Sequence, residues 1–236
     1  MDTIPIIEPL GDTALTIHFG DKINSNVSET VFSFFQTLKQ KSIPGITDII
    51  PAYSSLSIVY DIIEVRKNSR SKTAFEYLQN IIQEILHTKR NEYPTENRFF
   101  EIPVCYHPSV GIDIEEISTY KNLSTEELIH LHSNNVYRVY MLGFLPGFPY
   151  MGSLNEKLEI PRKKTPRTNI LAGSIGIAGL QTGIYPLNSP GGWNIIGQTP
   201  VQLFKSNREN PCLLQPGDNV IFTPISMTEF NRLQQL

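Results

Sequence analysis

The chain has 236 residues, of which 40% are hydrophobic and 18% are charged, as in an ordinary globular protein of one or two domains. Its formal net charge of −3 excludes a general electrostatic attraction to nucleic acid or to an anionic membrane. No stretch approaches the roughly 20 apolar residues that span a bilayer, and the first residues lack the basic-then-apolar order of a secretory signal, so we expect a cytoplasmic protein.

The first 90 residues predict a small α+β domain, in which one layer of sheet packs against helices. Apolar and polar side chains alternate over 14–20, which is typical of a half-buried strand. A helix is predicted to begin at Asn26 with a capping box, and a second helix at Thr73. The β-branched segment 46–61 is interrupted near its middle, which indicates a hairpin. The expected order of elements is roughly β-β-α-β-β-α.

The polar segment 91–98 is predicted to be a linker, because it carries charges and a proline but no apolar periodicity. From residue 99 onwards, short strands alternate with turns rich in glycine and proline, a pattern typical of a closed barrel or a sandwich. Two short helices are expected in this second domain, one over 113–120 and one capped by Ser124. The clearest strands are predicted at 99–106, 136–142 and 219–223.

The segment 143–200 is crowded with glycine and proline, which free or restrict the backbone and do not fill a core. Interleaved aromatic and cationic side chains favour shaped loops around a concave binding surface. The alternative is that tight barrel turns require the same glycines and prolines. The side chains that favour a site are Phe144, Phe148, Tyr150, Tyr185, Trp193, Arg162 and Arg167.

Four strings in the second half carry a resemblance to a known family: YRVYMLGFLPGFPYMG, PRKKTPR, AGSIGIAGLQTGIYPLNSPGGWNIIGQTP and NRENPCLLQPGDNVIFTPI. They resemble the family that contains the B subunit of bacterial ATP-dependent 5-oxoprolinase, the kinase-A inhibitor of sporulation signalling, proteins labelled allophanate hydrolase subunit 1, and carboxyltransferase subdomains C and D. The resemblance implies an N-terminal α/β sandwich domain at 1–90, followed by a cyclophilin-like β-barrel at 99–236. It also implies two partners, the C and A subunits of the same enzyme, and ATP with Mg²⁺ as co-substrate.

One turn departs from the family pattern. Members of the family carry a Gly-Gly-acid turn after the Val-Cys-Tyr strand, whereas residues 106–111 read YHPSVG. The acid is missing and His107 appears, a candidate general base, with an ordinary turn histidine as the alternative. His130 and His132 lie two positions apart on a predicted helix, so they point in different directions and make a poor metal pair.

The activity that the resemblance implies is the opening of the 5-oxoproline lactam to glutamate, coupled to ATP hydrolysis. An unstrained amide is a poor electrophile, so phosphorylation of its oxygen would create a leaving group. Such phosphoryl transfer depends on positioning and charge stabilisation. Arg162 and Arg167 are expected to clamp a carboxylate or a phosphate, because guanidinium can bind either group in a bidentate manner. Solvated surface cations are the alternative interpretation.

Further candidates for binding substrate or nucleotide supply hydroxyl, amide or backbone N–H groups: Ser174, Gln181, Tyr185, Ser189, Gly191 and Gly192. Phe148, Tyr150 and Trp193 are candidates for a pocket lining or a partner interface, with burial in the barrel core as the alternative. No Walker-type phosphate loop exists, so an ATP site must be unconventional or shared with a partner. No metal cluster is indicated, and Cys105 and Cys212 lack the spacing of a zinc or disulfide framework.

Two classes of function remain open. An enzyme component would share a composite site with the C subunit, would be assisted by the A subunit, and would be inactive as an isolated chain. A non-catalytic binding protein would instead grip the helical bundle of a sensor histidine kinase and inhibit it, since an aromatic, proline-rich surface suits a peptide as well as a small ligand. Prolyl isomerase activity would follow from the barrel fold alone and has no separate support.

Overall fold

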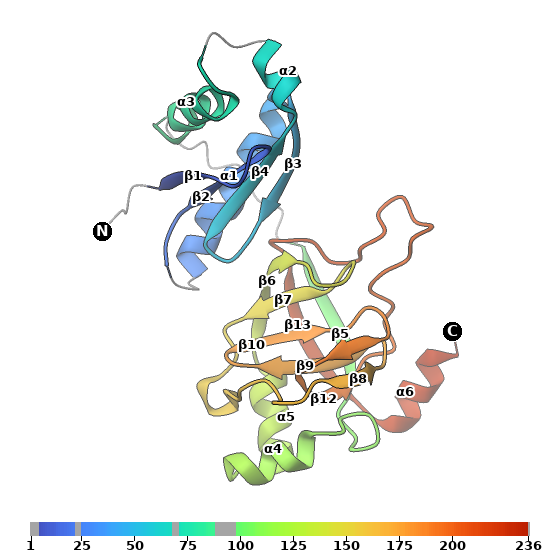
Figure 1. Cartoon of the computed structure of the whole chain (residues 1–236). Coiled ribbons are helices and arrows are strands. Elements are labelled where there is room, and N and C mark those ends of the chain that lie inside the picture. The colour runs from blue at the N-terminus through green and yellow to red at the C-terminus, as the bar shows by residue number, and fades with distance from the viewer. Residues whose placement is uncertain (1–4, 22–24, 68–70, 88–97, 236) are drawn as a thin grey trace. The chain divides into compact units, whose positions relative to one another are not determined.

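The computed structural model describes residues 5–21, 25–67, 71–87 and 98–235 (Figure 1). The chain divides into two compact units, Met1–Glu96 and Asn97–Leu236. All but the last residue of the predicted linker 91–98 lies outside the described residues. None of the described helices combines the length and the apolarity that crossing a membrane requires.

The first unit is a sheet covered by helices. Its strands are β1 Ile6–Pro9, β2 Ala14–His18, β3 Ile46–Pro51 and β4 Ser55–Tyr60, and its helices are α1 Ser25–Lys41, α2 Ile62–Lys67 and α3 Ala74–His87. The strands pair antiparallel in the order β1-β2-β4-β3. Alternation along β2 buries Leu15 and Ile17 in one apolar cluster with Phe34 of α1 and Leu78 of α3. The expected α+β layering is confirmed.

Local signals located some helix starts in this unit and missed others. The helix predicted at Thr73 is α3, and the Thr73 hydroxyl accepts a hydrogen bond from the Glu76 amide at 3.1 Å. The capping box predicted at Asn26 was wrong, because α1 already begins at Ser25 and Asn26 lies inside it. The short helix α2 was not predicted, although the Asp61 carboxylate accepts hydrogen bonds from two amides of its first turn.

The second unit is a closed β-barrel (Figure 1). Its strands are β5 Phe99–Cys105, β6 Val136–Leu142, β7 Pro149–Gly152, β9 Ser174–Ala178, β10 Gln181–Ile184, β12 Asn194–Gln198 and β13 Asn219–Ile225. They follow the order β10-β7-β6-β13-β5-β12-β9, and β5 and β13 are the parallel neighbours among them. Strands β8 Arg167–Ile170 and β11 Ser189–Gly191 form a separate two-stranded sheet. The predicted barrel is therefore confirmed.

The second unit also contains short helices: α4 Ile114–Lys121, α5 Thr125–Ser133, the 3-10 helix η1 Glu156–Leu158 and α6 Met227–Gln234. The predicted capping box of α5 is present, since the Ser124 hydroxyl accepts from the Glu127 amide at 3.1 Å and the Glu127 carboxylate accepts from the Ser124 amide at 2.8 Å. Helix α6 was not predicted, although the Ser226 hydroxyl caps it by accepting a hydrogen bond from the Glu229 amide at 3.2 Å.

Candidate functional site

An aromatic cluster lies on the segment that the sequence marks as a binding surface. Phe148, Tyr185 and Trp193 are buried. The Phe148 ring meets Tyr185 edge-on with centroids 5.2 Å apart and Trp193 with centroids 5.5 Å apart, an arrangement that aromatic quadrupoles favour. Tyr150 is partly exposed and packs against Phe148 at 4.8 Å and Trp193 at 5.8 Å. The structure thus brings four predicted site residues together.

Three glycines make room for these rings. A Cβ atom at Gly183 of β10 would lie 2.8 Å from the Phe148 ring, and one at Gly176 of β9 would lie 3.0 Å from the Trp193 Cβ. A Cβ atom at Gly191 of β11 would clash with the Tyr185 hydroxyl. These glycines are therefore explained by aromatic packing, and they do not form open turns.

Phe144 is the exposed member of the cluster. It is 61% exposed, and its ring meets Phe148 edge-on with centroids 5.7 Å apart. Its φ of 66° lies in the left-handed region, which costs a non-glycine residue about 1–2 kcal/mol. Strained backbone clusters at functional positions, and an exposed ring is a ready contact for a ligand or a partner.

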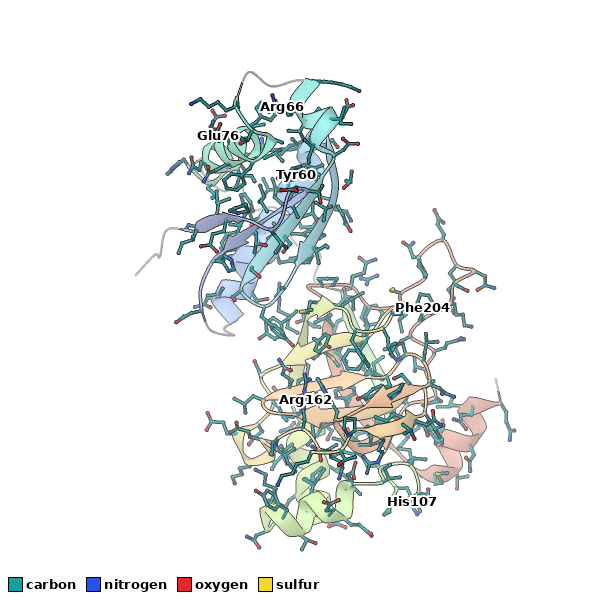
Figure 2. All side chains as sticks on the ribbon, viewed as in Figure 1. Tyr60, Arg66, Glu76, His107, Arg162 and Phe204 are labelled. Carbon is teal, nitrogen blue, oxygen red and sulfur yellow. The ribbon has the colours of Figure 1, made fainter. Side chains whose placement is uncertain are left out.

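Arg162 extends the aromatic cluster with a positive charge, and Figure 2 labels it on the barrel. Its guanidinium carbon lies 5.9 Å from the centroid of the Trp193 ring, a cation–π geometry. Burial raises the pKa of both Tyr150 and Tyr185, and the charge of Arg162 acts on both in the opposite direction. Among the described residues no carboxylate pairs with Arg162, so its N–H groups are open to an anion.

The other predicted clamp, Arg167, is already occupied. Its guanidinium donates hydrogen bonds to both carboxylate oxygens of Asp113, at 2.9 and 2.6 Å. Lys163 lies 2.8 Å from Asp113 and 3.1 Å from Glu116. Burial by itself would raise the pKa of the Asp113 carboxyl, but hydrogen bonds from the two cations and from a main-chain amide hold that pKa below its ordinary value. Both terminal nitrogens of Arg167 are therefore engaged in an ion pair that joins β8 to the residue before α4.

The segment that carries Arg162 is fixed on both sides of that residue. The Asn194 side-chain amide donates to the Pro161 carbonyl at 2.9 Å. The Lys163 main-chain amide donates to the Gly192 carbonyl at 2.8 Å. These two hydrogen bonds hold the backbone on both sides of Arg162 and so place its Cα beside the strand that follows Trp193.

The remaining predicted binding residues differ in accessibility. Ser174 and Ser189 are buried, and the Ser189 hydroxyl has no hydrogen-bond partner among the described residues. Gln181, the first residue of β10, is half-buried. A Cβ atom at Gly192 would have its nearest neighbour at 3.7 Å, an ordinary van der Waals contact, so this position has room for a Cβ atom.

His107 lies apart from the aromatic cluster. Figure 2 shows it on the second unit and well separated from Arg162. Its Nδ1 atom lies 2.8 Å from the Ser109 hydroxyl and accepts a hydrogen bond from the Ser109 amide at 3.2 Å. The exposed imidazole thus orders its own turn, which favours the turn-histidine interpretation over a general base at the cluster.

His132 is a buried polar residue whose role the sequence pattern did not reveal. Its Nδ1 lies 2.7 Å from the Tyr106 hydroxyl and its Nε2 lies 2.9 Å from the Thr182 hydroxyl. Because Thr182 donates to the Gly176 carbonyl, it must accept from Nε2–H, which leaves Nδ1 to accept from Tyr106. Burial lowers the pKa of His132 to about 3, so the ring is neutral. No group of His, Cys, Asp and Glu in the described part of the chain could hold a metal ion.

Two cavities of the described surface lie away from the aromatic cluster. One of about 220 Å³ is lined by residues that include His130, Asn135 and Ser153. The other, of about 490 Å³, is lined by α1, β3 and the turn between them. Neither is lined by a residue of the aromatic cluster.

Comparison with known proteins gives matches along most of the chain. A family model described as carboxyltransferase domain, subdomain C and D, matches residues 5–214. The 5-oxoprolinase B subunit of Bacillus subtilis (strain 168) is 42% identical over 231 residues, which cover 97% of this chain and 96% of that protein. The 5-oxoprolinase B subunit of Escherichia coli O157:H7 is 37% identical over 215 residues, covering 91% and 94%. The crystal structure of TTHA0988 superposes with a TM-score of 0.77 at 34% identity, over 90% of this chain and 40% of that longer chain.

Proposed function

The chain belongs to the carboxyltransferase subdomain C and D family, and we propose that it is the B subunit of an ATP-dependent 5-oxoprolinase that acts in the cytoplasm. The observation that carries this proposal is 42% identity over 97% of the chain to a relative of that name. The C and A subunits would complete the enzyme, and the isolated chain would be inactive. The chain matches only 40% of the longer TTHA0988 chain. This coverage supports the proposal that the chain acts together with a further domain or subunit.

The reaction would activate the lactam before opening it. The γ-phosphoryl group of ATP would move to the amide oxygen and leave ADP, and Mg²⁺ would neutralise charge on the phosphates. Water would then add to the carbon that carries this oxygen. The ring C–N bond would break, with a proton delivered to nitrogen, to give γ-glutamyl phosphate. A second water releases phosphate and glutamate. Because such transfers depend on positioning and on neutralising charge, the chain needs few chemically reacting side chains.

The described surface supplies the positioning groups. Arg162 would bind an anionic group of the substrate, and the rings beside it would contact the rest of the molecule. Arg167 would act indirectly, since its ion pair with Asp113 holds the segment on which Arg162 lies. Ser174, Gln181, Tyr185, Ser189, Gly191 and Gly192 stay candidates for contacts in the assembled enzyme.

Co-expression with the C and A subunits tests the proposal. We expect ATP hydrolysis that depends on 5-oxoproline in the assembled enzyme and none with the isolated chain. Arg162→Gln should lower kcat/KM for 5-oxoproline by about tenfold or more, since a charged hydrogen bond contributes roughly 1.5–3 kcal/mol. The matched control is Lys164→Gln, which removes an exposed cation of the same segment. Absence of 5-oxoproline-dependent hydrolysis in every combination of subunits would refute the proposal.

Inhibition of a sensor histidine kinase is the second candidate function, and the 61% exposed Phe144 favours it. An exposed apolar ring with strained backbone would suit a groove between helices of a kinase. Autophosphorylation of a purified kinase should then fall when the chain is added and recover with Phe144→Ala. Unchanged autophosphorylation at saturating chain would exclude this function for the kinase tested.

A further inference from the structure

The cations of the segment around Arg162 fall into two electrostatic classes. Lys163 and Arg167 face two carboxylates, Asp113 and Glu116, at hydrogen-bond distance. These four charges sum to zero, so this group exerts little net pull on a ligand anion. Arg162 is the cation that lies on the aromatic cluster without a carboxylate partner among the described residues.

Three glycines near the aromatic cluster, Gly173, Gly176 and Gly183, do not form a phosphate cradle. The Gly173 amide is used, since it donates to the Tyr185 carbonyl at 2.7 Å. Gly176 and Gly183 are directly opposite each other in the β9–β10 ladder, and aromatic side chains occupy the space beside both. A phosphate nest needs several successive N–H groups that point at open space, and these strand glycines do not provide them.

We infer that the surface formed by Phe144, Tyr150, Arg162 and Trp193 binds a small monocarboxylate with a compact ring, and that a nucleotide's polyphosphate binds elsewhere in the assembly. One guanidinium matches one carboxylate in a bidentate manner, whereas a triphosphate needs several cations or Mg²⁺. The ring of the ligand would contact the exposed Phe144 and the partly exposed Tyr150, because Trp193 is buried beneath the guanidinium. Under the proposed function, on which this inference rests for the identity of the ligand, the monocarboxylate is 5-oxoproline.

The fluorescence of Trp193 reports directly on this surface, because the chain contains one tryptophan and the guanidinium lies over it. The full chain, alone and in the complex with the C and A subunits, is titrated with 5-oxoproline, with 2-pyrrolidinone and with Mg-ATP. We expect a saturable change with 5-oxoproline and none with 2-pyrrolidinone, which has the same ring without the carboxylate. Arg162→Gln should weaken the 5-oxoproline response at least about tenfold, while Lys164→Gln should leave it within about twofold.

Two results would overturn the inference. One is a saturable response to Mg-ATP that Arg162→Gln abolishes, which would place polyphosphate on this arginine. The other is no Arg162-dependent response to 5-oxoproline in either the chain or the complex. The outcome is separate from that of the proposed function: binding of the lactam acid without ATP hydrolysis in any assembly would keep the inference and refute the enzyme. 5-Oxoproline-dependent ATP hydrolysis with unaltered kinetics in Arg162→Gln would keep the proposed enzyme and refute the inference.

Discussion

At the scale of single residues, the barrel holds a polar side chain where apolar ones are the rule. His132 is fully buried, stacks on Phe222 with centroids 4.6 Å apart, and has both ring nitrogens at hydrogen-bond distance from hydroxyls. Such a satisfied network specifies one arrangement of the surrounding strands, whereas a half-satisfied one would be costly. The cost of burial falls on the charged form of the imidazole, which makes the barrel sensitive to pH.

Protonation of His132 should destabilise the second unit in acid. Its folded pKa of about 3 lies below the unfolded value of 6.5, so between these values the unfolded state binds a proton that the folded state does not. The free energy of unfolding should therefore fall by up to about 1.4 kcal/mol for each pH unit below 6.5. Urea unfolding followed by Trp193 fluorescence at about pH 7.5 and about pH 5.5, on either side of the unfolded pKa, measures this. His132→Gln should flatten the dependence, and the exposed His130→Gln should keep it; equal slopes in all three chains would contradict the network.

Phe144 separates backbone strain from side-chain contact. Phe144→Ala removes the ring but keeps a Cβ at a φ of 66°, while Phe144→Gly removes the ring and the strain together. We expect the glycine variant to be about 1 kcal/mol more stable than the alanine variant. Thermal or urea unfolding of the pair measures the difference. An alanine variant as stable as the glycine variant would show that the turn relaxes without cost.

At the scale of elements, local patterns predicted what local interactions determine. Strand β6 and helix α5 were predicted well, because alternation and a capping box are contained within a few residues. Helix α6 was missed although Ser226 and Glu229 show the same cap spacing. The different states of Arg162 and Arg167 could not be predicted, since Asp113 lies 54 positions before its partner Arg167 and only the barrel brings them together.

Removing the charge of Asp113 should loosen the segment that carries Arg162. Asp113→Asn leaves Arg167 without its bidentate carboxylate and leaves Lys163 with the exposed Glu116 as its carboxylate partner, which should destabilise the second unit by about 2–4 kcal/mol. The carboxyl has a lowered pKa, so its contribution is present above about pH 4 and is lost as the pH falls through the folded value. The variant should lack that acid-dependent loss. Glu116→Gln changes a side chain that is 73% exposed and should lower the free energy of unfolding by less than about 0.5 kcal/mol. Similar losses for both variants would refute the role of Asp113 in holding this segment.

At the scale of the whole molecule, each unit has its own apolar core. One buried cluster joins residues between Leu15 and Ile82, and another joins residues between Ile102 and Phe222. The change of pattern near residue 99 could be predicted from the sequence, because strand alternation and frequent turns replace helical periodicity there. The parallel pairing of β5 with β13 could not, since β13 lies far along the chain beyond every other strand.

Separate cores should give separate unfolding transitions. Trp193 belongs to the second unit, so its fluorescence follows the barrel alone, whereas far-UV circular dichroism follows the helices of both units. We expect the two urea curves to differ, which two-state unfolding of the whole chain forbids. Asp113→Asn should shift the fluorescence transition to lower urea and leave part of the dichroism transition in place. A single shifted transition for both probes would mean that the units unfold together.

The parallel pairing of β5 with β13 also sets an order of events during translation. Strand β5 is made early in the second unit, but its parallel neighbour β13 is absent until the ribosome reaches Ile225. The first unit needs no residue beyond α3 for its described core, so it can fold while the barrel strands are still nascent. For most of its synthesis the barrel is an open sheet with exposed apolar strands and unpaired edges. That interval is when the growing polypeptide has the greatest need of a chaperone.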